Sequence, residues 1–304
     1  MKWVKKGVIF RPQGNRDWMV SHAAVPFADG LGNSTFRVYF SGRDRFNRSQ
    51  TGFLEIDLKE PARVLRLHPD PILPLGELGT FDESGAMLSW IVNQGEEKYF
   101  YYIGWNLGVT VPFRNAIGLA VSRDGGMTVQ KYSQGPILDR SIQDPFFLGS
   151  TCVMKDGENW RMWYLSAMGW KKKSGKLRHE YLIKYAHSRD GILWERPGIV
   201  CLDFQSEEEY AISRPCVLKD GGEYKMWYSY RGKSYRIGYA ESPDGLVWRR
   251  KDEEVGIDVS ETGWDSEMIE YPFVFDCQGQ RYMLYNGNDY GRTGIGLAIW
   301  APQT

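Results

Sequence analysis

Short apolar runs alternate with Asp-Gly turns along this chain, and the alternation returns at a period of several tens of residues. The clearest unit spans 213–248, where an apolar run, an aromatic run and an alternating run are separated by turns and followed by a Trp-bearing run. The unit before it, 152–194, has the same order of runs. This pattern predicts four short strands per unit, and such a repeat is typical of a β-propeller.

Three weaker copies occupy 19–67, 86–126 and 271–300, and the last of them ends one strand short. Residues 2–9 match the segments that follow the Trp of the two clear units. We therefore expect an all-β, five-bladed β-propeller with four antiparallel strands per blade. In this fold residues 2–9 complete blade five beside 294–300, which closes the ring and removes a sheet edge. A loose N-terminal tail is the alternative.

Length and charge narrow the class of protein. Five blades use all 304 residues and leave no linker-like stretch, so we expect residues 1–304 to form a single domain. Lys plus Arg number 38, as do Asp plus Glu, so no net field attracts nucleic acid or an anionic membrane. No apolar run is long enough for a signal peptide or a membrane span, which indicates a soluble, cytoplasmic protein. The oligomeric state stays open.

Cysteine usage argues against a metal site. Cys152 and Cys216 occupy the same place in consecutive repeats, inside an apolar strand, which suits a small buried hydrophobic side chain. Cys201 and Cys277 stand alone, and no Cys-x-x-Cys or Cys/His cluster is present. We expect no metal and no cofactor; a disulfide is the alternative role for these thiols.

A propeller brings two kinds of loop to one face around its central channel: those that lead into each innermost strand, and those between second and third strands. Here both kinds carry ionisable or bulky polar groups, whereas the opposite turns are of Lys-Asp-Gly and Arg-Asp-Gly type. We expect the functional site on the face that carries these two kinds of loop. For any one residue, a solvated loop charge or a structural ion pair is the alternative. The catalytic candidates are Asp144, Glu83, Glu270, Glu267 and His22. The substrate-binding candidates are Arg43, Asp44, Asp82, Trp105, Arg114, His179, Arg214, Arg231, Asn288 and Arg292.

Arginines dominate the second set. The stretch 43–48 holds three arginines, of which Arg43 is in this set, and the other four arginines of the set are expected at the same mouth. Guanidinium groups bind carboxylates and phosphates bidentately, so the site favours an anionic ligand such as a phosphorylated sugar, inorganic phosphate or an acidic sugar. The alternative is that each arginine pairs with a neighbouring Asp or Glu.

Two motifs carry a family resemblance. The Ser-x-Asp-Gly-x-x-Trp hairpins at 188–194 and 242–248, with Asp144-Pro145 ahead of the third unit, resemble the five-bladed propellers of glycoside hydrolase families 43, 32, 68, 117 and 130. The chain also looks similar to propellers found with surface-polysaccharide glycosyltransferases. The resemblance implies carboxylates from different blades, and Asp144 matches the supporting one. The chain departs from that pattern at 18–22, which lacks an Asp, and at Arg214, where an acid is expected.

We therefore expect a carbohydrate-active enzyme that cleaves or transfers a glycosidic or sugar-phosphate bond in bacterial-type glycan metabolism, with hydrolase- or phosphorylase-like chemistry. Glu83 and Glu270 are the acid/base candidates, Glu267 comes next, His22 is an alternative base, and Asp144 would orient and tune them. The alternative is a non-hydrolytic sugar or sugar-phosphate binding module, or a transferase, in surface-polysaccharide assembly. A protein-interaction propeller is a third interpretation, with the basic stretch 171–176 as a contact. A lone carboxylate among arginines would favour phosphorolysis or binding.

Overall fold

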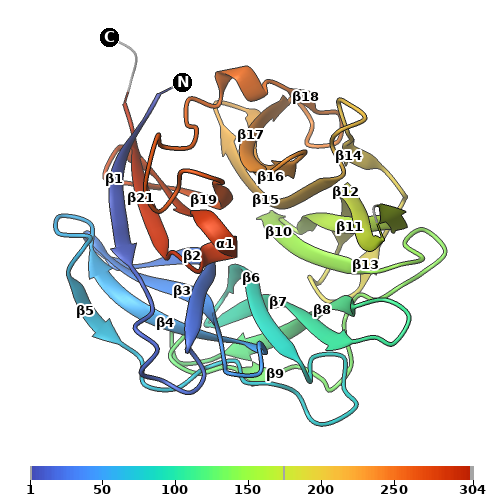
Figure 1. Cartoon of the computed structure of the whole chain (residues 1–304), viewed down its shortest axis with the longest axis horizontal. Helices are drawn as coiled ribbons and strands as arrows, with labels where there is room; N and C mark the ends of the chain where they lie inside the picture. Colours follow the sequence, from blue (N-terminus) through green and yellow to red (C-terminus); the bar gives the residue numbers. More distant parts are fainter. Residues whose placement is uncertain (1, 174, 302–304) are drawn as a thin grey trace.

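The computed structural model describes residues 2–173 and 175–301, and these residues form an almost entirely β structure. The all-β prediction is confirmed. Antiparallel pairing divides the strands into five groups, which Figure 1 shows around a common centre with the first strand of each group innermost. The first strands are β2 (Ser21–Gly32), β6 (Gly85–Gln94), β10 (Leu148–Asp156), β15 (Ala211–Asp220) and β19 (Glu270–Cys277).

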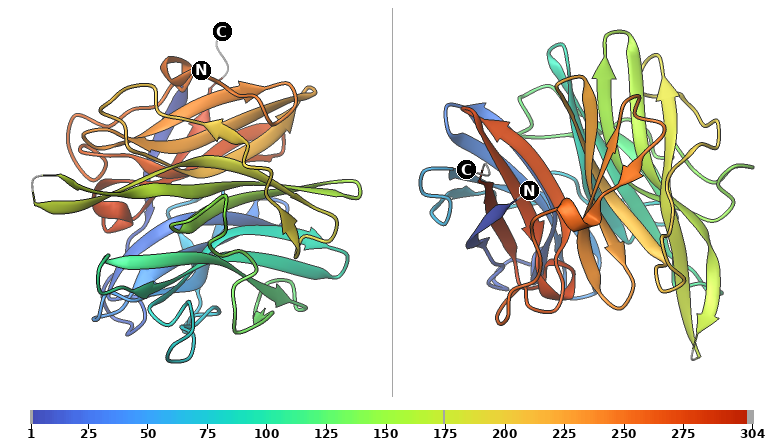
Figure 2. Two further views of the ribbon diagram at one scale, coloured as in Figure 1. Left: turned by 90° about the vertical axis from the view of Figure 1, so that its right-hand side faces the viewer. Right: turned by 90° about the horizontal axis from the view of Figure 1, so that it is seen from above.

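The second and third strands of each group form hairpins with the first. The second strands are β3 (Thr35–Arg43), β7 (Glu97–Leu107), β11 (Asn159–Lys173), β16 (Glu223–Arg231) and β20 (Gln280–Asn286). The third strands are β4 (Ser49–Asp57), β8 (Phe113–Ser122), β12 (Lys176–Ser188), β17 (Tyr235–Ser242) and β21 (Ile295–Trp300). The hairpin of β11 and β12 is the longest and extends beyond its neighbours (Figure 2).

The outer strands are short, except the one that comes from the N-terminus. They are β5 (Val64–Leu67), β9 (Gln130–Lys131), β13 (Trp194–Glu195) with β14 (Val200–Leu202), β18 (Arg249–Arg250) and β1 (Trp3–Phe10). β1 pairs antiparallel with β21, from Trp3 opposite Trp300 to Phe10 opposite Ile295. The two ends of the chain therefore meet in one sheet. The helical elements are η1 (Asp252–Glu254) and α1 (Asn288–Gly291).

Packing between neighbouring groups explains why the Asp-Gly turn contains glycine. An aromatic side chain of one group donates a hydrogen bond to the turn carbonyl of the next: Tyr101 Oη to Gly191 at 2.7 Å, and Trp163 Nε1 to Gly245 at 2.8 Å. Both glycines have φ of 76°, and a Cβ on Gly191 would lie 2.8 Å from Tyr101 Oη. Left-handed backbone and this close contact both require glycine, so the repeated turn couples neighbouring groups.

A ring of hydrogen bonds joins each first strand to the preceding group of strands near the centre. In each case a side chain of one group accepts from a backbone amide in the first strand of the next. The amide–acceptor pairs are Leu88–Thr51 at 2.8 Å, Thr151–Ser89 at 2.6 Å, Arg214–Ser150 at 2.8 Å, Tyr271–Ser229 at 2.7 Å and Val25–Asn286 at 2.9 Å. Every junction between groups therefore has a specific polar contact in addition to apolar packing.

The cysteines belong to this packed interior. Cys152 and Cys216 are fully buried, as predicted, and all four thiols are free. The Cys152 sulfur accepts the amide of Val217 at 3.3 Å, and the Cys216 sulfur accepts that of Val274 at 3.2 Å. Burial raises the pKa of both thiols, so they act as small neutral acceptors at the junctions.

Arg214, predicted to bind substrate, instead lies inside the ring and is 0% exposed. Its guanidinium donates to the carbonyls of Ser89 and Pro26, the latter at 3.0 Å, and lies over the ring of Trp90. It therefore links the fourth group to the first two. Burial lowers the pKa of Arg214 to about 10, so the group stays charged at neutral pH with only neutral acceptors.

We predict that Arg214→Met destabilises the protein by roughly 2–6 kcal/mol, because two buried carbonyls each lose a donor at about 1–3 kcal/mol. Urea-induced unfolding, followed by tryptophan fluorescence, measures the change. Arg189→Met is the matched control, since Arg189 is exposed on a turn. Equal stability of the two variants would show that the guanidinium does not hold the ring together.

Candidate functional site

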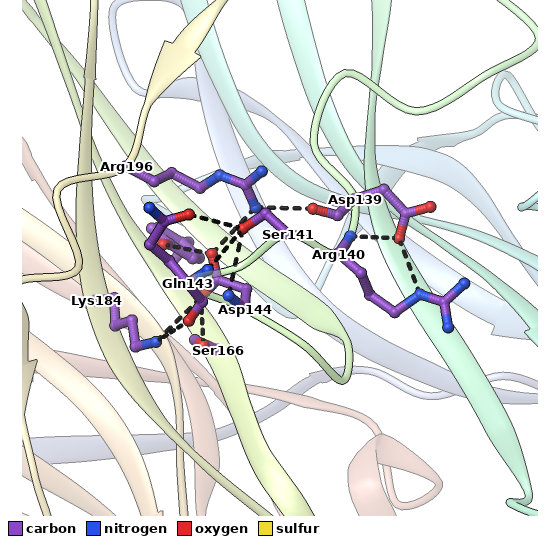
Figure 3. Close-up of polar contacts among 9 residues, drawn as sticks. Asp139, Arg140, Ser141, Gln143, Asp144, Ser166, Lys184 and Arg196 are labelled. Atoms are coloured by element: carbon purple, nitrogen blue, oxygen red, sulfur yellow. Dashed lines mark hydrogen bonds and ion pairs between the residues drawn. The ribbon is translucent and has the colours of Figure 1, made fainter.

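Asp144, the predicted supporting carboxylate, is 0% exposed and fully engaged (Figure 3). One oxygen accepts from Ser166 Oγ at 2.6 Å and Lys184 Nζ at 3.2 Å. The other accepts from Tyr164 Oη at 3.1 Å and Arg196 Nη1 at 3.0 Å. Four donors satisfy this carboxylate within its own group of strands, which is the pattern of a structural ion pair.

The same brace recurs in two other groups, each time with a Tyr that follows the Asp by 20 residues. Asp82 accepts from Tyr102 Oη at 3.0 Å and Lys131 Nζ at 2.6 Å; Asp265 accepts from Tyr285 Oη at 3.1 Å and Lys5 Nζ at 2.7 Å. Because the contact set repeats, Asp82 and Asp144 hold the loop ahead of a first strand onto the second strand. Their contacts give them a structural role in place of the predicted binding and tuning roles.

Several other predicted residues serve their own loops. Asp44 accepts the amides of Phe46 and Arg48 at 2.9 Å, and Glu83 accepts the amide of Gly79 at 2.7 Å. The side-chain oxygen of Asn288 accepts the amide of Glu267 at 2.8 Å. Trp105 packs on Gly85, where a Cβ would meet its indole nitrogen at 1.7 Å. Arg114, Glu267 and Arg292 are exposed.

Glu270 is different from all of these carboxylates. It is the first residue of β19, is 0% exposed, and neither side-chain oxygen has a hydrogen-bond partner among the described residues. Burial raises its pKa well above the usual value, while Arg231, Arg43 and the nearby amide of Tyr290, which lacks hydrogen-bonding geometry, act in the opposite direction. Burial therefore favours the protonated, neutral form of this carboxyl.

Arg231 and Arg43 end the second strands on either side of Glu270, in β16 and β3. Arg231 Nη1 donates to Tyr290 Oη at 2.5 Å, and its guanidinium lies 5.2 Å from the ring centre of Tyr235. Arg43 Nη1 donates to Asn47 at 2.9 Å. The Nε of each arginine is buried without a partner within the described residues. Of the five arginines predicted at one mouth, Arg43 and Arg231 thus lie near this carboxyl.

Two histidines border the arginines. Burial, followed by the charges of Arg43 and Arg292, lowers the pKa of His22 to about 4. Burial and the charge of Arg231 lower the pKa of His179 to about 4. Both imidazoles are therefore neutral at neutral pH, so the two arginines remain the dominant charges of the cluster.

An aromatic wall adjoins this cluster on the side of the long hairpin. The His179 ring stacks on Tyr181 with centres 5.0 Å apart and an interplanar angle of 9°. Trp170 lies edge-on to His179 at 5.4 Å, and Phe113 lies 5.2 Å from Trp170. Trp170, His179 and Phe113 are each partly exposed, so they present apolar ring surface beside the charged groups.

Backbone strain marks the same region. His22, Arg214 and Tyr271 have φ of 60°, 52° and 56°, and each follows the residue at which its first strand shifts register. A non-glycine residue in this conformation costs on the order of 1–3 kcal/mol. The same β-bulge therefore occurs near the start of three first strands. Glu270 is the residue just before the bulge in β19, as Ser21 is in β2 and Ser213 is in β15. Asp289 and Tyr290, two consecutive residues near Glu270, also have left-handed backbone conformations.

The sequence reasoning missed the tyrosines of the cluster: Tyr181, Tyr235, Tyr271 and Tyr290. Each lies within two residues of a position that the sequence analysis did select, or in the strand that follows one. Burial raises the pKa of Tyr181, Tyr235 and Tyr271, so they are neutral hydroxyls. The sequence signal that could have identified these tyrosines is their position next to the charged residues already selected.

Neither a metal centre nor a membrane helix is found in the part of the chain that the structure describes. Within residues 2–173 and 175–301, no group of three or more His, Cys, Asp or Glu side chains is placed to hold a metal ion. Over the same residues no helix has the length and apolar character needed to cross a membrane.

Two proteins of Mycobacterium tuberculosis are similar to the chain along its whole length. They are Uncharacterized protein MT1551 (strain CDC 1551 / Oshkosh) and Uncharacterized protein Rv1502 (strain ATCC 25618 / H37Rv). Each is 46% identical over 299 residues, which cover 98% of this chain and 99% of the relative. The chain belongs to their family. No family model matches it.

Solved structures with a similar fold are glycoside hydrolases. A glycoside hydrolase aligns with a TM-score of 0.79 and 17% identity, covering 98% of this chain and 92% of the other. A thermostable family-43 glycoside hydrolase aligns with a TM-score of 0.68 and 14% identity, covering 95% and 91%. The Bombyx mori GH32 β-fructofuranosidase BmSUC1 aligns with a TM-score of 0.62 and 15% identity, covering 91% and 61%. The resemblance to these hydrolases is confirmed at the level of the fold.

We predict that Glu270→Gln stabilises the protein at neutral and alkaline pH. The unfolded chain ionises this carboxyl near pH 4.5, whereas the folded protein keeps it protonated to a much higher pH. Its contribution is therefore complete below pH 4.5 and is lost as pH rises toward the folded pKa. Unfolding free energies of variant and wild type, measured across this pH range, should diverge only above pH 4.5. Glu267→Gln, at an exposed position, is the control, and parallel curves for Glu270→Gln would contradict the assignment.

Proposed function

We propose that the chain is a single five-bladed β-propeller domain and a carbohydrate-active enzyme. It would cleave or transfer a glycosidic or sugar-phosphate bond at the cluster around Glu270. The observation that carries this proposal is a fully buried, unpartnered carboxyl beside two arginines without carboxylate partners. The fold shared with glycoside hydrolases supports it at a coarse level. We also propose that the protein acts in the cytoplasm on a sugar, sugar phosphate or glycan.

Glu270 would act as the general acid. A proton donor to a leaving-group oxygen must be protonated at the working pH, and burial raises the pKa of Glu270 in that direction. The raised pKa also makes the protonated form available without a second carboxylate in hydrogen-bond contact. Glu83 makes its described contact with its own loop, and Glu267 is exposed, so neither shares these properties.

The partner of this acid differs between two mechanisms. Phosphorolysis needs one carboxyl acid and an anionic nucleophile, which Arg43 and Arg231 would hold. Hydrolysis needs a second carboxylate to act as base or nucleophile. Asp289 is the candidate, because its charge raises the pKa of Glu270 and its side chain is exposed. The arginines and the lone buried carboxyl favour the phosphorylase-like reaction.

A non-catalytic sugar or sugar-phosphate binding module, or a transferase in surface-polysaccharide assembly, is the second candidate. It is favoured by the departures from the hydrolase pattern: Asp144 is fully paired, and Arg214 is buried in the ring. A binding module would use the same arginines and aromatic wall but would not need a protonated Glu270.

Turnover by carboxylate variants separates these functions. Glu270→Gln should lower kcat by about 10²-fold or more, because general acid catalysis contributes about 10²–10⁴-fold. Glu83→Gln should keep near-wild-type kcat. The assay follows release of the alcohol from a panel of alkyl glycosides, whose poor leaving groups require protonation, with and without inorganic phosphate. The wild-type rate should fall as pH rises through the pKa of Glu270. Activity in Glu270→Gln equal to wild type would exclude the acid role.

A further inference from the structure

Among the described residues, Arg43 and Arg231 lack the carboxylate partners that Arg250 and Arg37 have, and like the buried Arg214 they donate to neutral acceptors only. Arg250 pairs with Glu209 at 2.7 Å and with Asp252 at 2.6 Å, and Arg37 pairs with Glu55 at 2.8 Å. Within the described residues no carboxylate pairs with Arg43 or Arg231, whose named acceptors are the neutral Asn47 and Tyr290. A partly buried guanidinium without a counter-charge carries a desolvation cost that an anion would offset.

The surroundings do not neutralise these charges. Both arginines lie close enough to Glu270 to act on its pKa, and burial favours the protonated form of that carboxyl, with no ion pair to either arginine among the described residues. The histidines beside them are neutral, and the buried tyrosines keep their protons. The exposed side chains of Arg292 and Asp289 add one charge of each sign at the edge of the cluster, so the charges of Arg43 and Arg231 are not cancelled. Partial burial strengthens their attraction for an anion relative to water.

The geometry leaves donors available. Each guanidinium uses Nη1 for its single described hydrogen bond, while its Nε is buried and unpartnered. A guanidinium edge binds phosphate or carboxylate with two parallel N–H groups. Arg43 and Arg231 reach the cluster from the ends of β3 and β16, so one anion beside Glu270 would be approached from both sides.

We propose that Arg43 and Arg231 bind an oxyanion, phosphate or carboxylate, next to Glu270, and that the Tyr290 hydroxyl takes the place of one anion oxygen on Arg231. This inference rests on the proposed function in one respect: the anion is either the nucleophile of the reaction or a substituent of the sugar. Tyr290 and Asp289 are held at φ of 58° in α1, so the segment that supplies this hydroxyl is strained.

Calorimetric titration tests the site without any turnover. The probes are inorganic phosphate, glucose 1-phosphate and glucuronate, with glucose as the uncharged control. Saturable binding of inorganic phosphate identifies a free anion as the ligand. Binding of glucose 1-phosphate or glucuronate alone identifies a substituent on the sugar. Absence of saturable binding for all three anions at tens of millimolar would overturn the proposal.

Variants locate the anion. Arg43→Met and Arg231→Met should each weaken binding of the anion tenfold or more, whereas Arg189→Met, an exposed arginine on a turn, should bind as wild type. Tyr290→Phe should bind the anion more tightly, because it frees Arg231 Nη1 without a change of charge or shape. Circular dichroism melts confirm folding of each variant. If an Arg→Met variant does not fold, Tyr290→Phe decides: unchanged or weaker binding contradicts the inference.

Failure of this inference can be told apart from failure of the proposed function. Glu270→Gln should lose turnover but still bind the anion, since the amide is neutral like the protonated acid. If no anion binds while Glu270→Gln loses turnover of uncharged glycosides, the anion site is wrong and the acid role stands. If the anion binds while Glu270→Gln keeps full turnover, the anion site stands and the acid role is wrong.

Discussion

The constraint on which this structure depends is the satisfaction of backbone groups where five first strands meet. Strand amides at this depth have little water to bond, so each requires a partner from the protein. The neighbouring group supplies it, through Thr51, Ser89, Ser150, Ser229 and Asn286. Arg214 adds a charged donor to two carbonyls inside the same ring. Residues near the centre therefore have structural roles, and the candidate functional residues lie at the ends of the first strands.

At those ends, the protein separates carboxylates into two kinds. Asp82, Asp144 and Asp265 are buried with a Tyr and a basic side chain, so their charge is compensated. Glu270 is equally buried but has no such partner among the described residues, and it sits at the start of a strand whose next residue is left-handed. An unpaired buried acid and a strained backbone both reduce stability, and such costs concentrate where function requires them.

Much of the fold could be predicted from the sequence because the repeated motif reflects a packing contact between neighbouring groups of strands. The Asp-Gly turns recur because Tyr101 and Trp163 pack against glycines in the next group, so the motif reports the junction itself. The roles of individual charges could not be predicted in the same way. Arg214 and Arg231 are both arginines near strand ends in one unit, yet one lies inside the ring and the other beside Glu270. The difference depends on a bulge that reverses the direction of one side chain, and no local sequence pattern encodes it.

The role of Asp144 could not be predicted from its sequence motif either. Its Asp-Pro sequence matches the supporting carboxylate of the hydrolase propellers, but Lys184 and Arg196 satisfy it here. A carboxylate that already accepts four hydrogen bonds has little capacity to tune a neighbour or contact a substrate. With this residue occupied, a reaction at the cluster must draw its second charge from elsewhere. In the proposed function, an anion held by Arg43 and Arg231 supplies that charge, since neither guanidinium pairs with a carboxylate among the described residues and both act on the pKa of Glu270.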